Sequence, residues 1–124
     1  MALRALASLQ PLARLTAPTM VERDAAIHRF EYTSETSWKL AQLFLLREEG
    51  VAVGSPKAAV RASLEAGLLD DAAAARALQM VDDRNSTVHT YQEALAQQIF
   101  ARLAAHSALL AQWIASMQAR LPAS

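Results

Sequence analysis

The octet of residues 84–91, with the sequence RNSTVHTY, combines an arginine, a histidine and a tyrosine in a chain that has only three histidines and two tyrosines. The guanidinium of Arg84 is a permanent, fork-shaped cation that suits a phosphate. The imidazole of His89 can move a proton near neutral pH, and the hydroxyl of Tyr91 can donate, accept or be modified. Together these side chains indicate work on a phosphodiester rather than on a metal, an acyl group or a redox cofactor.

The reaction that fits the octet is cleavage of RNA without a metal ion. His89 would take the proton from a ribose 2′-hydroxyl or return one to the leaving oxygen, while Arg84 stabilises the charge that builds on the phosphorus oxygens. We expect Asn85 to orient the imidazole or the phosphate, and Asp82 or Glu93 to fix the tautomer of His89. Since the sequence has no His/Asp/Glu cluster at ligand spacing, it predicts neither a metal site nor a cofactor.

On one straight helix these residues would not meet. Each residue turns an α-helix by about 100°, which places Arg84 and Tyr91 on one face and His89 roughly 140° away from Arg84. Two arrangements could reunite them. Either the helix breaks near His89, or a two-fold dimer brings two copies of the octet together so that each site borrows residues across the axis.

The composition sets limits on the kind of protein. A chain of 124 residues fits one domain with its own core, and 53% hydrophobic residues with only three glycines and four prolines favour helices. Twelve basic and twelve acidic residues balance, which argues against a non-specific nucleic-acid coat but leaves room for a local site for one RNA strand. The absence of cysteine excludes disulfides and thiolate chemistry. No apolar run reaches the roughly 18 residues of a membrane span, so we expect a soluble, cytoplasmic protein.

Start and stop signals divide the chain into helices. A first helix is expected over about residues 3–15. Thr19 and Glu22 match a capping box, and the absence of proline and glycine from there to Gly50 predicts one long helix. Ser55-Pro56 opens a short helix that runs to about Ala66.

The second half of the chain continues the same pattern. Asp70 or Asp71 starts a further helix towards Val81, and Thr90 with Glu93 matches a second capping box that would open the last helix. The sequence therefore predicts a single all-α domain over residues 1–124, an up-and-down bundle of four main helices plus a short extra one.

Apolar residues at steps of three and four mark the inner faces of the two longest helices. These stripes are Ile27, Phe30, Ser34, Trp38, Ala41 and Leu45 in the earlier helix, and Leu95, Ile99, Leu103, Leu110, Trp113 and Met117 in the later one. Glu35 and Lys39 are expected to form an ion pair along one helix. His28 and His106 have no partner pattern and are interpreted as ordinary surface or boundary residues.

Three blocks of the sequence resemble HEPN-domain proteins, in the nucleotidyltransferase substrate-binding branch known as HepT-like toxins. The octet fits the R-x4-H-x-Y signature of that family. The blocks are Phe30-Glu31-Tyr32-Thr33 with Glu35 and Trp38-Lys39; Ser55-Pro56-Lys57 with Arg61 and Ala66-Gly67-Leu68; and Met80 with Asp83-Arg84-Asn85 and His89-Thr90-Tyr91. Their order and spacing over about residues 20–100 make the resemblance specific. One departure is Ala77, where the family often carries a tryptophan that would serve as an aromatic packing anchor.

The resemblance implies a bundle that forms a homodimer face to face, with the motif residues lining the dimer cleft. It implies a metal-independent ribonuclease toxin with Arg84 and His89 as the catalytic pair, Asn85 in support and RNA as substrate. The implied partner is a minimal nucleotidyltransferase that acts as antitoxin and adenylylates Tyr91, which would place a bulky anion beside the arginine. Two alternatives stay open: a non-catalytic subunit that presents a substrate or nucleotide to that nucleotidyltransferase, and a purely structural helical dimer.

Overall fold

The computed structural model describes residues 1–121, which form five α-helices, one 3-10 turn and no strand. In chain order these are α1 (Ala2–Ala13), α2 (Met20–Glu49), α3 (Pro56–Glu65), α4 (Asp71–Ser86), the 3-10 turn η1 (Thr87–His89) and α5 (Glu93–Arg120). The predicted all-α class, with four main helices and a short extra one, is confirmed. No helix within this part of the chain is both long enough and apolar enough to cross a membrane.

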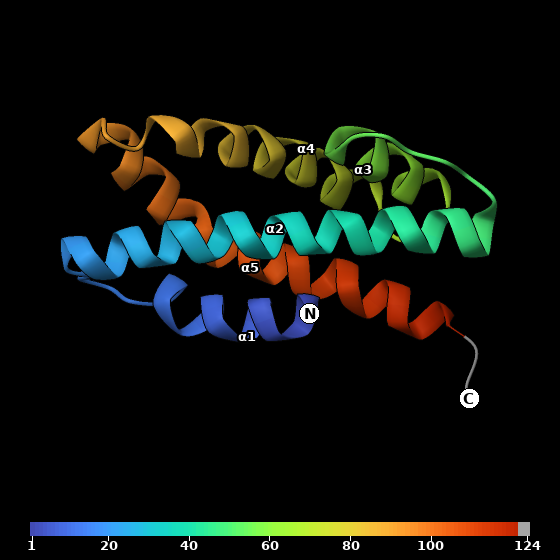
Figure 1. Cartoon of the computed structure of the whole chain (residues 1–124), viewed down its shortest axis with the longest axis horizontal. Coiled ribbons are helices and arrows are strands. Elements are labelled where there is room, and N and C mark those ends of the chain that lie inside the picture. Colours follow the sequence, from blue (N-terminus) through green and yellow to red (C-terminus); the bar gives the residue numbers. More distant parts are fainter. Residues whose placement is uncertain (122–124) are drawn as a thin grey trace.

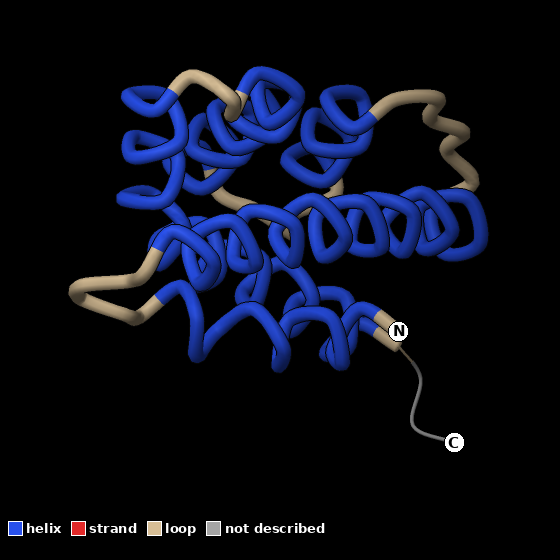
Figure 2. Tube along the Cα trace, turned by 60° about the vertical axis from the view of Figure 1, so that its left-hand side comes forward, coloured by secondary structure: helices blue, strands red, loops and turns tan. Residues whose placement is uncertain are grey.

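The two long helices form the centre of the bundle. Helix α2 packs against α5, α1 contacts both on one side, and α3 and α4 cover the other side (Figure 1). Helices α1 and α4 run antiparallel to α2, whereas α5 runs parallel to α2 (Figure 1). Successive main helices therefore alternate in direction, and the predicted up-and-down order is correct. The second view keeps α1 and the α3–α4 pair on opposite sides of α2 (Figure 2). The turn between α4 and α5, which holds the octet, therefore lies at one end of the bundle.

Local signals set most helix ends. The Thr19 hydroxyl accepts from the Glu22 amide at 3.1 Å and the Glu22 carboxylate accepts from the Thr19 amide at 2.9 Å, so the first capping box is confirmed. Ser55 and Asp70 cap α3 and α4 in the predicted way. Helix α2 ends at Gly50, whose φ of 66° lies in the left-handed region that glycine adopts without strain.

The second capping box is wrong. Helix α5 begins at Glu93 with no side-chain cap, because the Thr90 hydroxyl donates to the Thr87 carbonyl and the Glu93 carboxylate is bonded to Arg23. Helix α4 also continues past the predicted end at Val81 to Ser86. The turn that was missed carries Asp83, which is buried, so tertiary contacts extend the helix beyond its apolar pattern.

The core follows the two predicted stripes. All their members are buried except Trp38 and Leu95, which pack against the core from its edge. The indole of Trp113 is fully buried and donates to the Ser63 hydroxyl at 3.0 Å, which ties α5 to α3. Ala77, the position that departs from the family pattern, is also fully buried within this core.

Candidate functional site

The octet lies where α4 ends and the chain turns into α5, at the gold-to-orange end of the bundle (Figure 1). The α-helix stops at Ser86, and three residues of 3-10 helix carry the chain to His89. The Thr87 hydroxyl donates to the Arg84 carbonyl at 2.7 Å, and the Thr90 hydroxyl donates to the Thr87 carbonyl at 3.0 Å. Such side-chain bonds compete with the helical ladder. The predicted helix break near His89 is therefore confirmed, and it begins a few residues earlier than expected.

Arg84 is half-buried in the last turn of α4. One guanidinium nitrogen, Nη1, donates to the Thr87 hydroxyl at 3.3 Å, while Nε is buried and has no hydrogen-bond partner. The positive charge also reaches α2: the pKa of Glu35 is held below its ordinary value, first by the hydrogen bond from Trp38 and to a smaller extent by the charges of Lys39 and Arg84. A buried donor without an acceptor is costly in a folded protein. The other terminal nitrogen, Nη2, makes no hydrogen bond within residues 1–121 and is not among the buried atoms, so it is the donor of Arg84 that an anion could reach.

His89 and Tyr91 are exposed and adjacent to each other. The Tyr91 hydroxyl lies 3.4 Å from Nδ1 of His89, and the two rings meet edge to face with centroids 5.9 Å apart. Tyr91 is 78% exposed. Among residues 1–121, nothing else bonds to the His89 ring, and the residue is exposed. The imidazole can therefore exchange a proton with an incoming molecule, and the phenol is open to modification.

The remaining predicted site residues do not join this group within one chain. No bond links Arg84 to His89 in the described part of the chain, and Asn85 is exposed. Asp82 pairs with Lys57 at 2.7 Å. Glu93 accepts from Arg23 at 2.6 Å and from Gln97 at 3.2 Å. The expected support of His89 by Asp82 or Glu93 is thus not formed, because both carboxylates already have partners elsewhere.

A buried ion cluster beside Arg84 was missed from the sequence. The Asp83 carboxylate accepts two bonds from Arg102, at 2.7 Å from Nε and 2.8 Å from Nη2, and its Oδ2 also lies 2.7 Å from Nε2 of His106. The His106 ring stacks on Phe30 of α2 with centroids 5.4 Å apart and 18° between the planes. His106 is 6% exposed, so its interpretation as a surface or boundary residue is wrong.

The electrostatics of this cluster favour its ionised form. Burial alone would raise the pKa of Asp83, but the hydrogen bonds from Arg102 and His106 outweigh burial and hold that pKa below its ordinary value of 3.8. The bond to Asp83 raises the pKa of Arg102 in turn, against a smaller opposing effect of burial. Helical spacing could have placed His106 in the core, although not its partners: His106 follows Leu103 by three residues and precedes Leu110 by four, on the inner stripe of α5.

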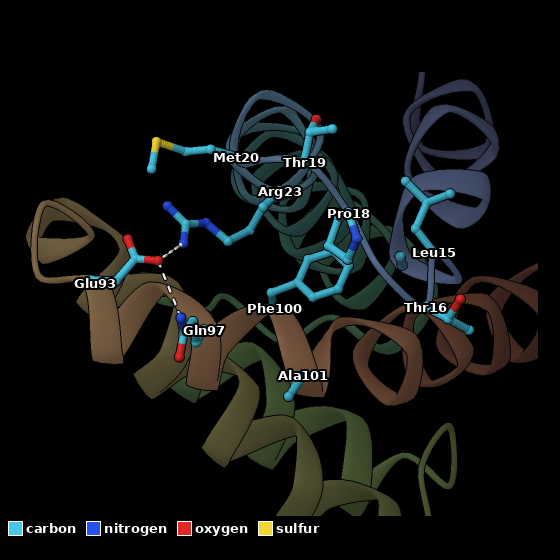
Figure 3. Close-up of a pocket in the computed structure, with 11 residues that line it drawn as sticks. Leu15, Thr16, Pro18, Thr19, Met20, Arg23, Glu93, Gln97, Phe100 and Ala101 are labelled. Atoms are coloured by element: carbon cyan, nitrogen blue, oxygen red, sulfur yellow. Dashed lines mark hydrogen bonds and ion pairs between the residues drawn. The ribbon is translucent and has the colours of Figure 1, made fainter.

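A hollow of about 540 Å³ lies between the α1–α2 turn and the start of α5 (Figure 3). Figure 3 shows the Arg23 side chain reaching from α2 to Glu93, with Gln97 bonded to the same carboxylate. The bond that Arg23 donates to Glu93 raises the pKa of Arg23, and the Arg23 guanidinium also donates to Asp24. Because these charges are paired with one another, the hollow offers less free chemistry than the octet. Within residues 1–121, no three His, Asp or Glu side chains converge in a way that could hold a metal ion.

Comparisons with known proteins now place the chain. A family model described as nucleotidyltransferase substrate binding protein like matches residues 2–119. The chain belongs to this family. It is also similar to a protein of Thermus thermophilus known from a crystal structure, with 51% identity, a TM-score of 0.93, and coverage of 95% of this chain and 99% of that one. A comparison with curated proteins gave no match.

Membership of the nucleotidyltransferase substrate-binding family confirms the branch that the three sequence blocks indicated. The family description points to a nucleotidyltransferase-related partner. The roles of Arg84, Asn85, His89 and Tyr91 stay predictions, as do the homodimer and the RNA substrate.

Proposed function

We propose that this family member is a metal-independent endoribonuclease toxin, active as a homodimer, and that a minimal nucleotidyltransferase neutralises it by adenylylating Tyr91. One observation carries the proposal. Arg84 lies in the last turn of α4 with its Nη2 unbonded, and the exposed pair His89–Tyr91 lies on the short break that follows directly. A cation with spare donors and a solvent-facing imidazole are the two groups that phosphodiester cleavage requires.

The proposed reaction uses the 2′-hydroxyl of the RNA itself. His89 takes the proton of that hydroxyl, the oxygen attacks the adjacent phosphorus, and the bond from phosphorus to the 5′-oxygen breaks. The leaving 5′-oxygen takes up a proton, so the products are a 2′,3′-cyclic phosphate and a 5′-hydroxyl. Arg84 bonds to the non-bridging oxygens as their negative charge increases, with Asn85 as a further donor to the phosphate.

A dimer supports this reaction better than one chain does. Arg84 and His89 are not bonded to each other within the chain, whereas a two-fold axis near the octet would present two arginines and two imidazoles to one phosphate. One imidazole could then take the 2′-hydroxyl proton while its symmetry mate protonates the leaving oxygen. Measurement of molar mass by light scattering tests the shared cleft, which a fully active monomer would contradict.

Adenylylation of Tyr91 would switch this site off. The phenolic oxygen attacks the α-phosphorus of ATP, pyrophosphate leaves, and a negatively charged phosphodiester is fixed to the tyrosine. The 78% exposure of Tyr91 allows access by a second protein, and its hydroxyl already lies 3.4 Å from the His89 ring. The attached phosphate would compete with RNA for the same cations.

Growth of cells expressing the chain alone tests the catalytic pair. Wild type should arrest growth, whereas Arg84→Ala and His89→Ala should abolish the arrest. Arg76→Ala and His28→Ala are matched controls, because both residues are exposed and lie outside the octet, and they should behave as wild type. Arrest that survives both octet substitutions would overturn the ribonuclease proposal.

Intact-mass spectrometry after co-expression with the genomic neighbour tests the modification. We expect a mass increase of one or more AMP units on wild type, its loss in Tyr91→Phe, and its retention in Tyr32→Phe. Tyr32 is the matched control because it is the other tyrosine of the chain and is 48% exposed. An adduct that persists in Tyr91→Phe would assign the modification to another residue.

The second candidate is a non-catalytic subunit that presents a substrate or nucleotide to the nucleotidyltransferase. The family description favours it, and an arginine with spare donors would serve phosphate binding equally well. Purified dimer mixed with RNA separates the two candidates. Binding without cleavage, weakened by Arg84→Ala but unaffected by His89→Ala, would favour the subunit.

A further inference from the structure

We infer that Asp83, Arg102 and His106 form a positioning clamp that fixes the rotation of α4 and thereby aims the guanidinium of Arg84 into the octet site. The inference rests on the proposed function only for its activity measurement. The clamp itself is defined by contacts among the helices α2, α4 and α5. These contacts converge on Asp83, the residue directly before Arg84.

Asp83 and Arg84 are neighbours on α4, so their side chains leave the axis about 100° apart. The Asp83 side chain is turned to α5, where it meets Arg102 and His106. A rotation of α4 that moved Arg84 would therefore have to break the bonds of Asp83.

The bonds of Asp83 are directional as well as short. Arg102 donates to both carboxylate oxygens of Asp83, at 2.7 Å and 2.8 Å. Such a bidentate bond fixes the relative orientation of the guanidinium and carboxylate planes as well as the distance between them. His106 lies one turn further along α5 and reaches Oδ2 from the same helix face. Since an ionised carboxylate only accepts, Nε2 of His106 is the donor in this contact.

The clamp also includes a contact with α2. The His106 ring is stacked on Phe30, so the clamp connects α4 to both long helices. Apolar side chains of similar volume would hold α4 about as strongly, but they would permit sliding and rotation that a directional bond forbids. The last turn of a helix is also its least constrained part. Arg84 lies in that turn, only two residues before α4 ends.

Nuclear magnetic resonance of the Arg84 Nε–H group tests the clamp without reference to catalysis. Loss of the peak in Arg84→Lys assigns it. In wild type the peak should exchange slowly with water, because Nε is buried. We expect Asp83→Asn to shift the peak and to speed its exchange by about tenfold or more. Arg102→Lys should do the same, because lysine keeps the charge but lacks the fork.

A destabilised control separates positioning from general loss of stability. Ser63→Ala removes the partner of the Trp113 indole in the buried contact between α3 and α5, and it should lower the Tm without changing the Arg84 signal. An unchanged signal in folded Asp83→Asn and Arg102→Lys would overturn the clamp. So would an equal change in Ser63→Ala. If Asp83→Asn does not fold, Arg102→Lys decides, since Arg102 is partly exposed.

The activity measurement follows the same variants. Asp83→Asn and Arg102→Lys should lower kcat for RNA cleavage by about tenfold, through misplacement of Arg84, while Ser63→Ala retains wild-type kcat below its Tm. Full kcat in Asp83→Asn with a displaced Arg84 signal would overturn the stated consequence of the clamp. Failure of wild type to cleave RNA would count against the proposed function alone, because the resonance of Arg84 reports on the clamp in an inactive protein as well.

Discussion

Two neighbouring residues of α4 lie in opposite environments. Both carboxylate oxygens of Asp83 are bonded, to Arg102 and His106. Arg84 has one long bond to Thr87 and a buried Nε with no partner. The fold therefore satisfies the buried carboxylate of Asp83 fully but leaves the half-buried guanidinium of Arg84 with unused hydrogen-bond donors. That difference separates a residue that holds the bundle together from a residue that is available to a ligand.

The two histidines of these regions differ in the same way. His106 is buried, bonded to Asp83 and stacked on Phe30, so its position and its donor nitrogen are fixed. His89 is exposed and has only the 3.4 Å contact with the Tyr91 hydroxyl. The first imidazole maintains structure, and the second is free to move a proton. Substitutions in the two regions should therefore affect different measurements.

The largest expected effect on stability is that of Asp83→Ala. It leaves the buried His106 and the partly buried Arg102 without their shared acceptor, and we expect the free energy of unfolding to fall by about 3 kcal/mol. Arg84→Ala removes a donor without a partner and one 3.3 Å bond to Thr87, so its effect should stay within about 1 kcal/mol. Urea unfolding followed by circular dichroism measures both. Equal losses of unfolding free energy in Asp83→Ala and Arg84→Ala would contradict the distinction between a residue that stabilises the bundle and one that is available to a ligand.

The second-largest expected effect is that of acid, which should lower the contribution of the buried cluster to the free energy of unfolding. Because the folded-state pKa of Asp83 lies below the ordinary value of 3.8, its contribution to stability is complete above that value and is lost as pH falls through the folded pKa. One such group changes the free energy of unfolding by at most about 1.4 kcal/mol per pH unit. Asp83→Asn should therefore show a shallower fall than wild type between about pH 5 and about pH 3.

The exposed neighbour supplies the control for this titration. Asp82→Asn is the matched variant, since Asp82 is exposed and its partner is Lys57 at the surface, where an ion pair contributes little to stability. Glu35 and Glu93 also have lowered pKa values, but they are present in every variant and cancel in the difference. Parallel curves for Asp83→Asn and wild type would mean that the cluster does not depend on the carboxylate charge.

Much of the fold could be predicted because its signals are local. The Thr19–Glu22 box, the Ser55 and Asp70 caps and Gly50 act within four residues of the helix ends that they define. Helical periodicity then identified the buried faces of α2 and α5. The predicted capping box of Thr90 and Glu93 is wrong because Glu93 is bonded to Arg23, 70 residues away in the chain. No local sequence pattern predicts such a distant partner.

The site was predictable in its residue types but not in its surroundings. The octet and its helix break followed from sequence, whereas the cluster beside it joins Asp83 to residues 19 and 23 positions later. Periodicity places position 106 on the inner face of α5, but the interpretation of His106 as a surface or boundary residue rests on its lack of a partner pattern in the sequence. Long-range polar pairs depend on how the helices pack, which composition and spacing do not specify.

Thr87 connects the two regions, and its substitution should have an intermediate effect. It is buried, donates to the Arg84 carbonyl and accepts from the Arg84 guanidinium. Thr87→Val keeps the shape but removes both bonds, so we expect a loss of about 1 kcal/mol in the free energy of unfolding together with faster exchange of the Arg84 Nε–H. Thr16→Val, at an exposed threonine, is the control. Loss of stability without any change at Arg84 would assign Thr87 to the fold alone.

The smallest expected effect on stability is that of Tyr91→Phe. The hydroxyl is exposed and its contact with His89 is 3.4 Å long, so the free energy of unfolding should change by less than about 0.5 kcal/mol. Toxicity should persist, because the proposed chemistry needs His89 and Arg84 but not the phenol. Neutralisation by the nucleotidyltransferase should fail, since no oxygen remains to receive AMP. Growth with and without the partner measures this, and rescue of Tyr91→Phe cells as complete as that of wild type would show that control does not pass through this residue. A variant that is stable and toxic but cannot be neutralised would place the control of the protein in the exposed region alone.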